Sequence, residues 1–122
     1  MLSVDYQIKM KINKREFLDS LDRATLLIKD SDKKPIRLSI DDRTLGLKIS
    51  SLIGSLNEEI DIEKEGNNLV IGFNPKLIID ALRVIDDENV TIYFNNTKSP
   101  CVIKDDAETY IYLILPMGIN EE

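Results

Sequence analysis

The sequence predicts an α+β fold in which two helices pack on antiparallel sheet. Each half of the 122-residue chain reads as a strand, an asparagine-capped helix and a meander of alternating strands. The two halves also superimpose when the sequence is shifted by 61 residues, which places Ile12-Asn13 on Phe73-Asn74. Such an internally duplicated strand-helix-meander unit implies two helices side by side against the sheet, with pseudo-twofold symmetry.

The first unit is expected to begin with a strand and a helix. Residues 6–12 alternate between apolar and polar side chains, which is typical of a half-buried strand. Asn13 followed by Glu16 resembles a capping box, and the helix that it starts is expected to run to about Ile28. The polar segment that ends at Pro35 is then a loop.

Alternating strands make up the rest of the first unit. Residues 36–40 and 45–49 predict a hairpin about the turn 41–44. Small residues at 50–55 are expected to form a connection to the next alternating strand, 56–64. The other expected strands are, in chain order, 69–73, 90–94, 101–104 and 109–115.

The second helix is expected to start at Asn74-Pro75. Asparagine suits the N-cap, and proline suits the first helical position, where its missing N–H leaves no hydrogen bond unmade. Ile78, Leu82 and Ile85 fall on one face of this helix.

The composition excludes most catalytic chemistry. The chain has no histidine and one cysteine, so it cannot build a Ser-His-Asp triad, a Cys-His pair or a zinc site from these ligands. Its 16 Lys and Arg against 22 Asp and Glu give a net charge of −6, which speaks against simple electrostatic capture of nucleic acid. We therefore expect a non-enzymatic domain without a metal or cofactor.

Length and cysteine usage favour a single cytoplasmic domain. The whole chain, 1–122, suits one domain, and the segments 1–5 and 118–122 are expected to be flexible ends. The lone Cys101 cannot form an internal disulfide and is expected to pack as a small apolar side chain. Since no signal peptide is recognisable, a reducing compartment is favoured.

Three pairs of adjacent aspartates are candidate Mg²⁺ ligands, because that ion prefers carboxylate oxygens. They are Asp41-Asp42, Asp86-Asp87 and Asp105-Asp106. All three lie in predicted turns, where aspartate is favoured for local hydrogen bonds. A structural role is therefore favoured over a small metal-dependent phosphoryl-transfer enzyme.

The last strand differs from the others because it does not alternate. Residues 110–117 are apolar except for tyrosine hydroxyls, whereas a strand with one wet face should alternate. Two explanations stay open. This is either a central strand buried on both faces, or a strand whose end lines an exposed apolar groove for a partner peptide.

Three segments carry a family resemblance. They are Tyr112-Leu113-Ile114-Leu115-Pro116-Met117, Phe73-Asn74-Pro75-Lys76-Leu77-Ile78-Ile79-Asp80-Ala81-Leu82, and residues 16–27 with 35–38. Together they resemble the third, C-terminal domain of the bacterial DNA polymerase III beta subunit, the sliding clamp. The resemblance extends from about residue 6 to 117 and implies the DNA-clamp fold.

The resemblance implies a part in DNA replication without catalysis. In the family, two three-domain protomers form a homodimeric ring around duplex DNA and tether the polymerase by topology. The implied partners are the DNA polymerase III catalytic subunit, the clamp loader and other proteins with a clamp-binding motif. The isolated domain is expected to be monomeric. The alternative is a free-standing clamp-like domain that binds partner peptides without encircling DNA.

The resemblance also assigns residues to three surfaces. The partner-peptide cleft takes Asn74, Leu77, Lys98, Pro100, Leu113, Ile114, Leu115, Pro116 and Met117. The subunit interface takes Leu27, Ile28, Glu58 and Glu59, and the DNA-facing helices carry Arg23, Lys76 and Arg83. One departure is that Gly118-Ile119 follows Pro116-Met117, where the family usually has a basic residue and an aliphatic one.

Overall fold

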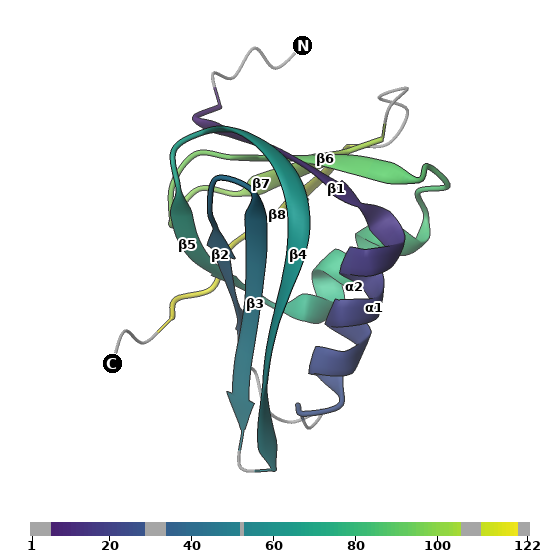
Figure 1. The fold of residues 1–122 in the computed structure, drawn as a ribbon, viewed down its shortest axis with the longest axis vertical. Helices are drawn as coiled ribbons and strands as arrows, with labels where there is room; N and C mark the ends of the chain where they lie inside the picture. The colour runs from purple at the N-terminus through teal and green to yellow at the C-terminus, as the bar shows by residue number, and fades with distance from the viewer. Residues whose placement is uncertain (1–5, 29–33, 52, 106–110, 120–122) are drawn as a thin grey trace.

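One antiparallel sheet packs against two helices in the part of the chain that the structure describes (Figure 1). This computed structural model describes residues 6–28, 34–51, 53–105 and 111–119. The elements are, in chain order, β1 (Ile8–Asn13), α1 (Lys14–Thr25), β2 (Ile36–Ile40), β3 (Thr44–Ser51), β4 (Gly54–Gly66), β5 (Leu69–Phe73), α2 (Pro75–Arg83), β6 (Asn89–Phe94), β7 (Cys101–Lys104) and β8 (Ile111–Ile114). The α+β prediction is confirmed.

The sheet shows the predicted duplication as an exchange of strands between the two units. Its order is β5-β2-β3-β4-β1-β6-β7-β8. The first strand of each unit therefore pairs with the meander of the other: β1 pairs with β6, and β5 pairs with β2. The strands of the first unit remain neighbours in the order β2-β3-β4-β1, whereas β5 is separated from β6-β7-β8 and lies beside β2 of the first unit.

Both predicted asparagine caps are confirmed. The Asn13 side chain accepts a hydrogen bond of 3.0 Å from the Glu16 backbone N–H, and Asn74 accepts one of 3.0 Å from the Lys76 backbone N–H. Each bond satisfies a donor that the first helical turn leaves without a partner. The strand that precedes each helix ends at the cap or just before it, so each helix follows its strand without a loop.

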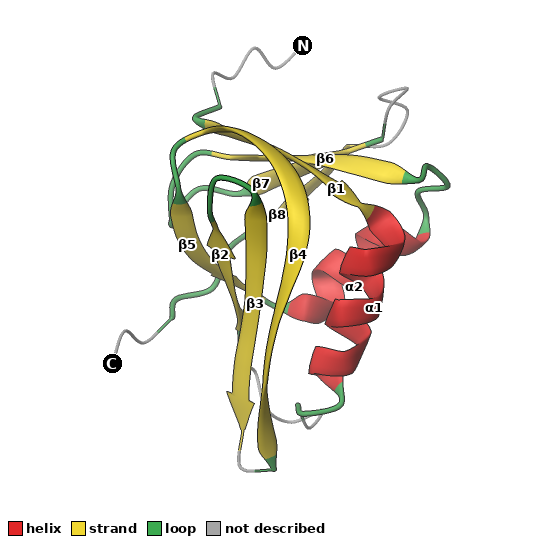
Figure 2. Ribbon diagram, viewed as in Figure 1, coloured by secondary structure: helices red, strands yellow, loops and turns green. Residues whose placement is uncertain are grey.

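The two helices lie side by side on one face of the sheet, as Figure 2 shows. The buried residues of α1 include Phe17, Leu21 and Ala24, and those of α2 include Ile78 and Leu82. They belong to one continuous core with the inward side chains of the strands. The apolar stripe predicted for each helix is therefore the face that the sheet covers.

The thirteen-residue strand β4 joins the two halves of the sheet. Residues 54–61 pair with β3, and residues 62–66 pair with β1 on the other side. The connection predicted at 50–55 is wrong, because the ladder continues to the pair Ser51↔Gly54. Serine and glycine carry no apolar alternation, but ladder hydrogen bonds come from the backbone and do not need it.

The last strand lies at the edge of the sheet. The central-strand explanation for residues 110–117 is wrong, since β8 pairs with β7 and is the last strand in the order. Beyond β8 the chain reaches the opposite end of the sheet, where the Met117 N–H donates a hydrogen bond of 2.8 Å to the Gly72 carbonyl. Of the two segments predicted to be flexible ends, the structure describes only Gly118 and Ile119.

The aspartate pairs lie in turns where the structure describes them. The Asp41 N–H donates to the Thr44 carbonyl at 2.9 Å across the β2–β3 turn, and Asp86-Asp87 lies between α2 and β6. Asp106 is outside the described residues. Within them, no three His, Cys, Asp or Glu side chains gather where a metal ion could be held, and no helix is long and apolar enough to cross a membrane.

Cys101 is buried, as expected for a small packed side chain. Burial removes the thiolate from water and raises the pKa of the thiol to about 12.

We expect Gly66→Ala to lower the free energy of unfolding by roughly 1–3 kcal/mol, because Gly66 adopts a φ of 101° at the end of β4. A Cβ there would also lie 2.0 Å from the Gln7 carbonyl oxygen. Urea denaturation would measure the loss. Gly46→Ala in β3 is the matched control, since its Cβ would meet Ser39 at an ordinary 3.6 Å. Equal losses in the two variants would contradict this account.

Candidate functional site

An apolar groove of about 400 Å³ lies between α2 and β8. Its lining residues are Leu77, Asp80, Ala81, Val84, Tyr112, Leu113, Ile114 and Leu115. The helix supplies one wall, and the edge strand with the residue after it supplies the other.

The groove exists because both elements carry apolar side chains on their solvent faces. In the last strand Ile114 points into the core, while Leu113 and Leu115 on either side of it are 61% and 68% exposed. On α2, Leu77 and Val84 are two turns apart and therefore lie on one face, and both are about half exposed. Large exposed apolar side chains gathered on one patch mark an interaction site more often than a free surface.

Few polar groups interrupt this apolar lining. Asp80 is the only charged side chain among the described residues of the groove, and the Tyr112 hydroxyl adds a second polar group. An apolar surface with a few polar groups to fix orientation is typical of a site that binds a small ligand or a short peptide.

The structure brings together part of the predicted cleft. Leu77, Leu113, Ile114 and Leu115 line the groove. The other five predicted residues lie outside its lining: Asn74, Lys98, Pro100, Pro116 and Met117.

These five residues lie in three parts of the fold. Asn74 caps the start of α2, and Pro116 and Met117 continue the chain beyond Leu115. Lys98 and Pro100 lie on the loop between β6 and β7. The Asn96 side chain shapes that loop by accepting hydrogen bonds of 2.9 Å from the N–H groups of Lys98 and Ser99.

Sequence reasoning missed Asp80, Ala81, Val84 and Tyr112 as groove residues. Val84 could have been found, because it follows Leu77 by seven residues and so repeats on the same helical face, outside the core stripe. Asp80 follows Leu77 by three residues and falls on the same face, but a charged side chain there reads as an ordinary solvent-exposed one. For Tyr112 the sequence holds no such signal, since its part in the groove depends on β8 lying beside α2.

A second apolar surface lies at the end of α1 and the tip of the β3–β4 hairpin. Leu26 is 76% exposed and Ile53 is 62% exposed. The predicted interface residues Leu27 and Ile28 are partly buried and pack against the core beneath them. Beside this surface, residues 54–61 of β4 pair with β3 on one side and, within the described part of the chain, with no strand on the other, so that half of β4 has an open edge.

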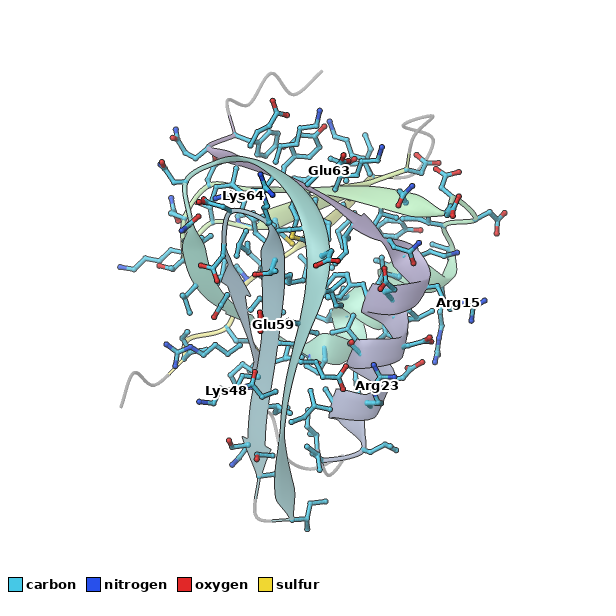
Figure 3. The ribbon with its side chains drawn as sticks, in the orientation of Figure 1. Arg15, Arg23, Lys48, Glu59, Glu63 and Lys64 are labelled. Carbon is cyan, nitrogen blue, oxygen red and sulfur yellow. The ribbon has the colours of Figure 1, made fainter. Side chains whose placement is uncertain are left out.

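Glu58 on β4 and Arg23 on α1 form an ion pair, although the sequence assigned them to different surfaces. The Glu58 carboxylate accepts from Arg23 Nε at 2.8 Å and Nη2 at 2.6 Å, and from Ser20 Oγ at 2.7 Å. Figure 3 shows Arg23 on the lower turns of α1, next to β4. The hydrogen bond from Arg23 is the main cause that lowers the pKa of Glu58. The ion pair thus connects α1 to the part of β4 that pairs only with β3.

The other predicted DNA-facing residues, Lys76 and Arg83, are exposed on α2. Arg83 Nη2 lies 3.6 Å from Asp22 Oδ1 of α1, which links the two helices. Glu59 points to the opposite face of β4 from Glu58 and is exposed. The outward faces of the helices carry both signs of charge, since Lys76 and Arg83 are basic and Asp22 is acidic.

The fold is that of the sliding clamps. A crystal structure from Eubacterium rectale described as a putative DNA polymerase III beta subunit matches with a TM-score of 0.92 and 61% identity, over 96% of this chain and 32% of that one. The DNA polymerase sliding clamp of Bacillus subtilis matches with a TM-score of 0.91 and 30% identity, over 98% of this chain and 32% of that one.

Sequence comparison gives the family. The family model for the C-terminal domain of the DNA polymerase III beta subunit matches residues 1–118. The beta sliding clamp of Staphylococcus aureus is 39% identical over 118 residues, which cover 93% of this chain and 31% of the relative. This chain belongs to the family formed by the C-terminal domains of DNA polymerase III beta subunits, and it spans about a third of the length of the relatives that it matches.

We expect the Arg23–Glu58 pair to stabilise the fold in a pH-dependent way. Because folding lowers the pKa of Glu58 from its ordinary value of 4.5, the contribution is present above that value and is lost as the pH falls through the lower folded pKa. The Tm difference between the wild type and Glu58→Gln should therefore be largest near neutral pH and shrink as the pH falls below 4.5. Thermal melts across the acid range would measure it.

Glu59→Gln is the matched control, because Glu59 lies on the other face of the same strand. A Tm difference for Glu58→Gln that stays constant from neutral to acid pH would show that the pair does not act through this carboxylate.

Proposed function

We propose that this chain is the third domain of a replication sliding clamp, and that its α2–β8 groove binds short apolar segments of partner proteins. The observation that carries the proposal is the pairing of Leu113 and Leu115 on the β8 side with Leu77 and Val84 on the α2 side of the groove. Membership of the family supports it. The partners that we propose are the DNA polymerase III catalytic subunit, the clamp loader and other proteins with the same binding segment.

The chemistry of the groove favours an extended or loosely folded apolar segment. Two or three large apolar side chains would replace water over the exposed leucines, which is the main source of affinity in such sites. We assign the remaining predicted residues to the ends of the site. Asn74 and Lys98 offer polar atoms there, and Pro100, Pro116 and Met117 offer further apolar contact.

The second surface suits assembly into a ring. We propose that the unpaired edge of β4 and the exposed Leu26 and Ile53 meet another protomer, next to Leu27, Ile28 and Glu59. An open strand edge readily pairs with another strand, and the flanking apolar side chains would be buried with it. The complete protein would thus be a homodimer.

A ring acts on DNA by enclosing it. Enclosure needs no base contacts and no catalytic residue, so the absence of histidine from the sequence and the net charge of −6 are both compatible with this function. Lys76 and Arg83 on the exposed face of α2 are the residues that we propose to approach the phosphates, since basic side chains lower the repulsion between protein and duplex. The proposed protein is a processivity factor rather than an enzyme.

We expect Leu113→Ser to weaken binding of a short apolar peptide about ten-fold or more, because one buried leucine side chain accounts for roughly 1.5–3 kcal/mol. Fluorescence anisotropy with a labelled peptide rich in leucine and phenylalanine would measure the affinity, and NMR would map the contact. Leu26→Ser is the matched control, since Leu26 is at least as exposed but lies at the end of α1. Equal losses, or NMR shifts confined to the Leu26 surface, would contradict the groove assignment.

We expect the 122-residue chain alone not to remain on nicked circular DNA during gel filtration, because retention by enclosure requires a closed ring. Linearising the DNA should then make no difference to its elution. Retention on circular DNA that is lost on linear DNA would show that this chain closes a ring by itself.

A further inference from the structure

Gly72 in β5 lies against the end of the chain more closely than any side chain would allow. A Cβ at this position would come within 2.3 Å of Ile119 Cγ2 and 2.9 Å of the Met117 carbonyl oxygen. It would also lie 3.3 Å from Pro35 Cβ. Real Cβ atoms do not approach backbone oxygen so closely, so the chain end fits here because residue 72 is glycine.

The position is buried although it faces away from the core. The side chains of Ile71 and Phe73, on either side of Gly72, point inward and are almost fully buried. Because side chains alternate along a strand, a side chain at position 72 would point outward. The chain end, residues 117–119, covers this position, and the Met117 N–H donates a hydrogen bond of 2.8 Å to the Gly72 carbonyl. Met117 and Ile119 are themselves partly buried there.

Comparison of the two units shows that the Gly72–Met117 contact stands where the first unit has a strand ladder. β8 occupies in the second unit the place that β4 occupies in the first, and β5 corresponds to β1. β4 pairs with β1 over five residue pairs, from Ile8↔Gly66 to Ile12↔Ile62. Among the described residues, the corresponding contact of the second unit is the one bridge Gly72↔Met117. A single point of pairing therefore holds the end of the last strand.

This point of pairing is connected directly to the groove. Only Pro116, whose φ is fixed by its ring, separates Met117 from the groove residue Leu115. β8 has four residues and, among the residues that the structure describes, a partner strand on one side only, so its end would fray without a second attachment. The bond at Gly72 supplies that attachment on the far side of Leu115.

We propose that Gly72 is a positioning residue for the groove: by admitting the chain end, it holds Leu113 and Leu115 in the arrangement that receives a partner segment. This inference rests on the proposed function of the groove. Gly72 itself does not touch the groove. It acts by raising the fraction of molecules in which the groove wall is formed, and the apparent dissociation constant is inversely proportional to that fraction.

The first test is amide hydrogen exchange of Met117 in Gly72→Ala. We expect a protected amide in the wild type and a rapidly exchanging one in the variant, because the Met117 carbonyl must move away from the new methyl group. Gly46→Ala, another strand glycine, is the control and should leave Met117 protected. Unchanged protection in Gly72→Ala would overturn the proposal.

The second test is the affinity for the leucine- and phenylalanine-rich peptide. We expect Gly72→Ala to lower it about ten-fold, the effect of losing one hydrogen bond and its packing. Met117→Pro deletes the same N–H donor without changing β5, so it tests the proposal even if Gly72→Ala does not fold. Because Met117→Pro also removes a side chain that we assign to the end of the site, Met117→Ala, which keeps the N–H, is its control and should bind more tightly than Met117→Pro. If both act through one attachment, the double variant binds no more weakly than Met117→Pro alone, whereas additive losses would overturn the positioning role.

These measurements separate the two proposals. If the wild type binds the peptide and Gly72→Ala binds it equally well, the positioning role is wrong and the groove assignment stands. If the wild type binds no such peptide, the groove assignment is wrong, and the exchange of Met117 still decides whether Gly72 holds the chain end.

Discussion

The exchange of first strands between the two units is the constraint on which the rest of the structure depends. β1 lies between β4 and β6, and β5 pairs with β2, so each unit completes the sheet of the other. Each helix follows directly from an exchanged strand through an asparagine cap. The helices are therefore brought side by side by the sheet itself, and their apolar faces close one core rather than two.

Among the described residues, the same topology leaves strand edges without a partner, and two of them lie beside exposed apolar side chains. Residues 54–61 of β4 have an open edge next to Leu26 and Ile53, and β8 has an open edge next to the groove. In each place exposed apolar side chains lie beside unpaired backbone, which favours contact with another polypeptide. The domain thus has its surfaces for association where its own pairing stops.

Local signals in the sequence predicted the helices, their caps and most strands, because capping chemistry and alternation depend on neighbouring residues. The extension of β3 and β4 through Ser51 and Gly54 could not be predicted in this way, since the backbone forms that ladder without help from side chains. The ion pair between Arg23 and Glu58 and the contact at Gly72 depend on packing between distant segments. For the groove, the apolar sequence of β8 gave a signal, but only the edge position of β8 in the sheet excluded a central strand buried on both faces.

The burial of Cys101 has a practical consequence for studying this chain. With a thiol pKa of about 12, the nucleophilic thiolate is a very small fraction of the side chain at neutral pH, and β7 leaves little room for a reagent to enter. Maleimide and nitroxide reagents should therefore react with the Cys101 thiol very slowly. A cysteine introduced on either open edge can then carry a fluorophore or spin label in an otherwise unaltered background.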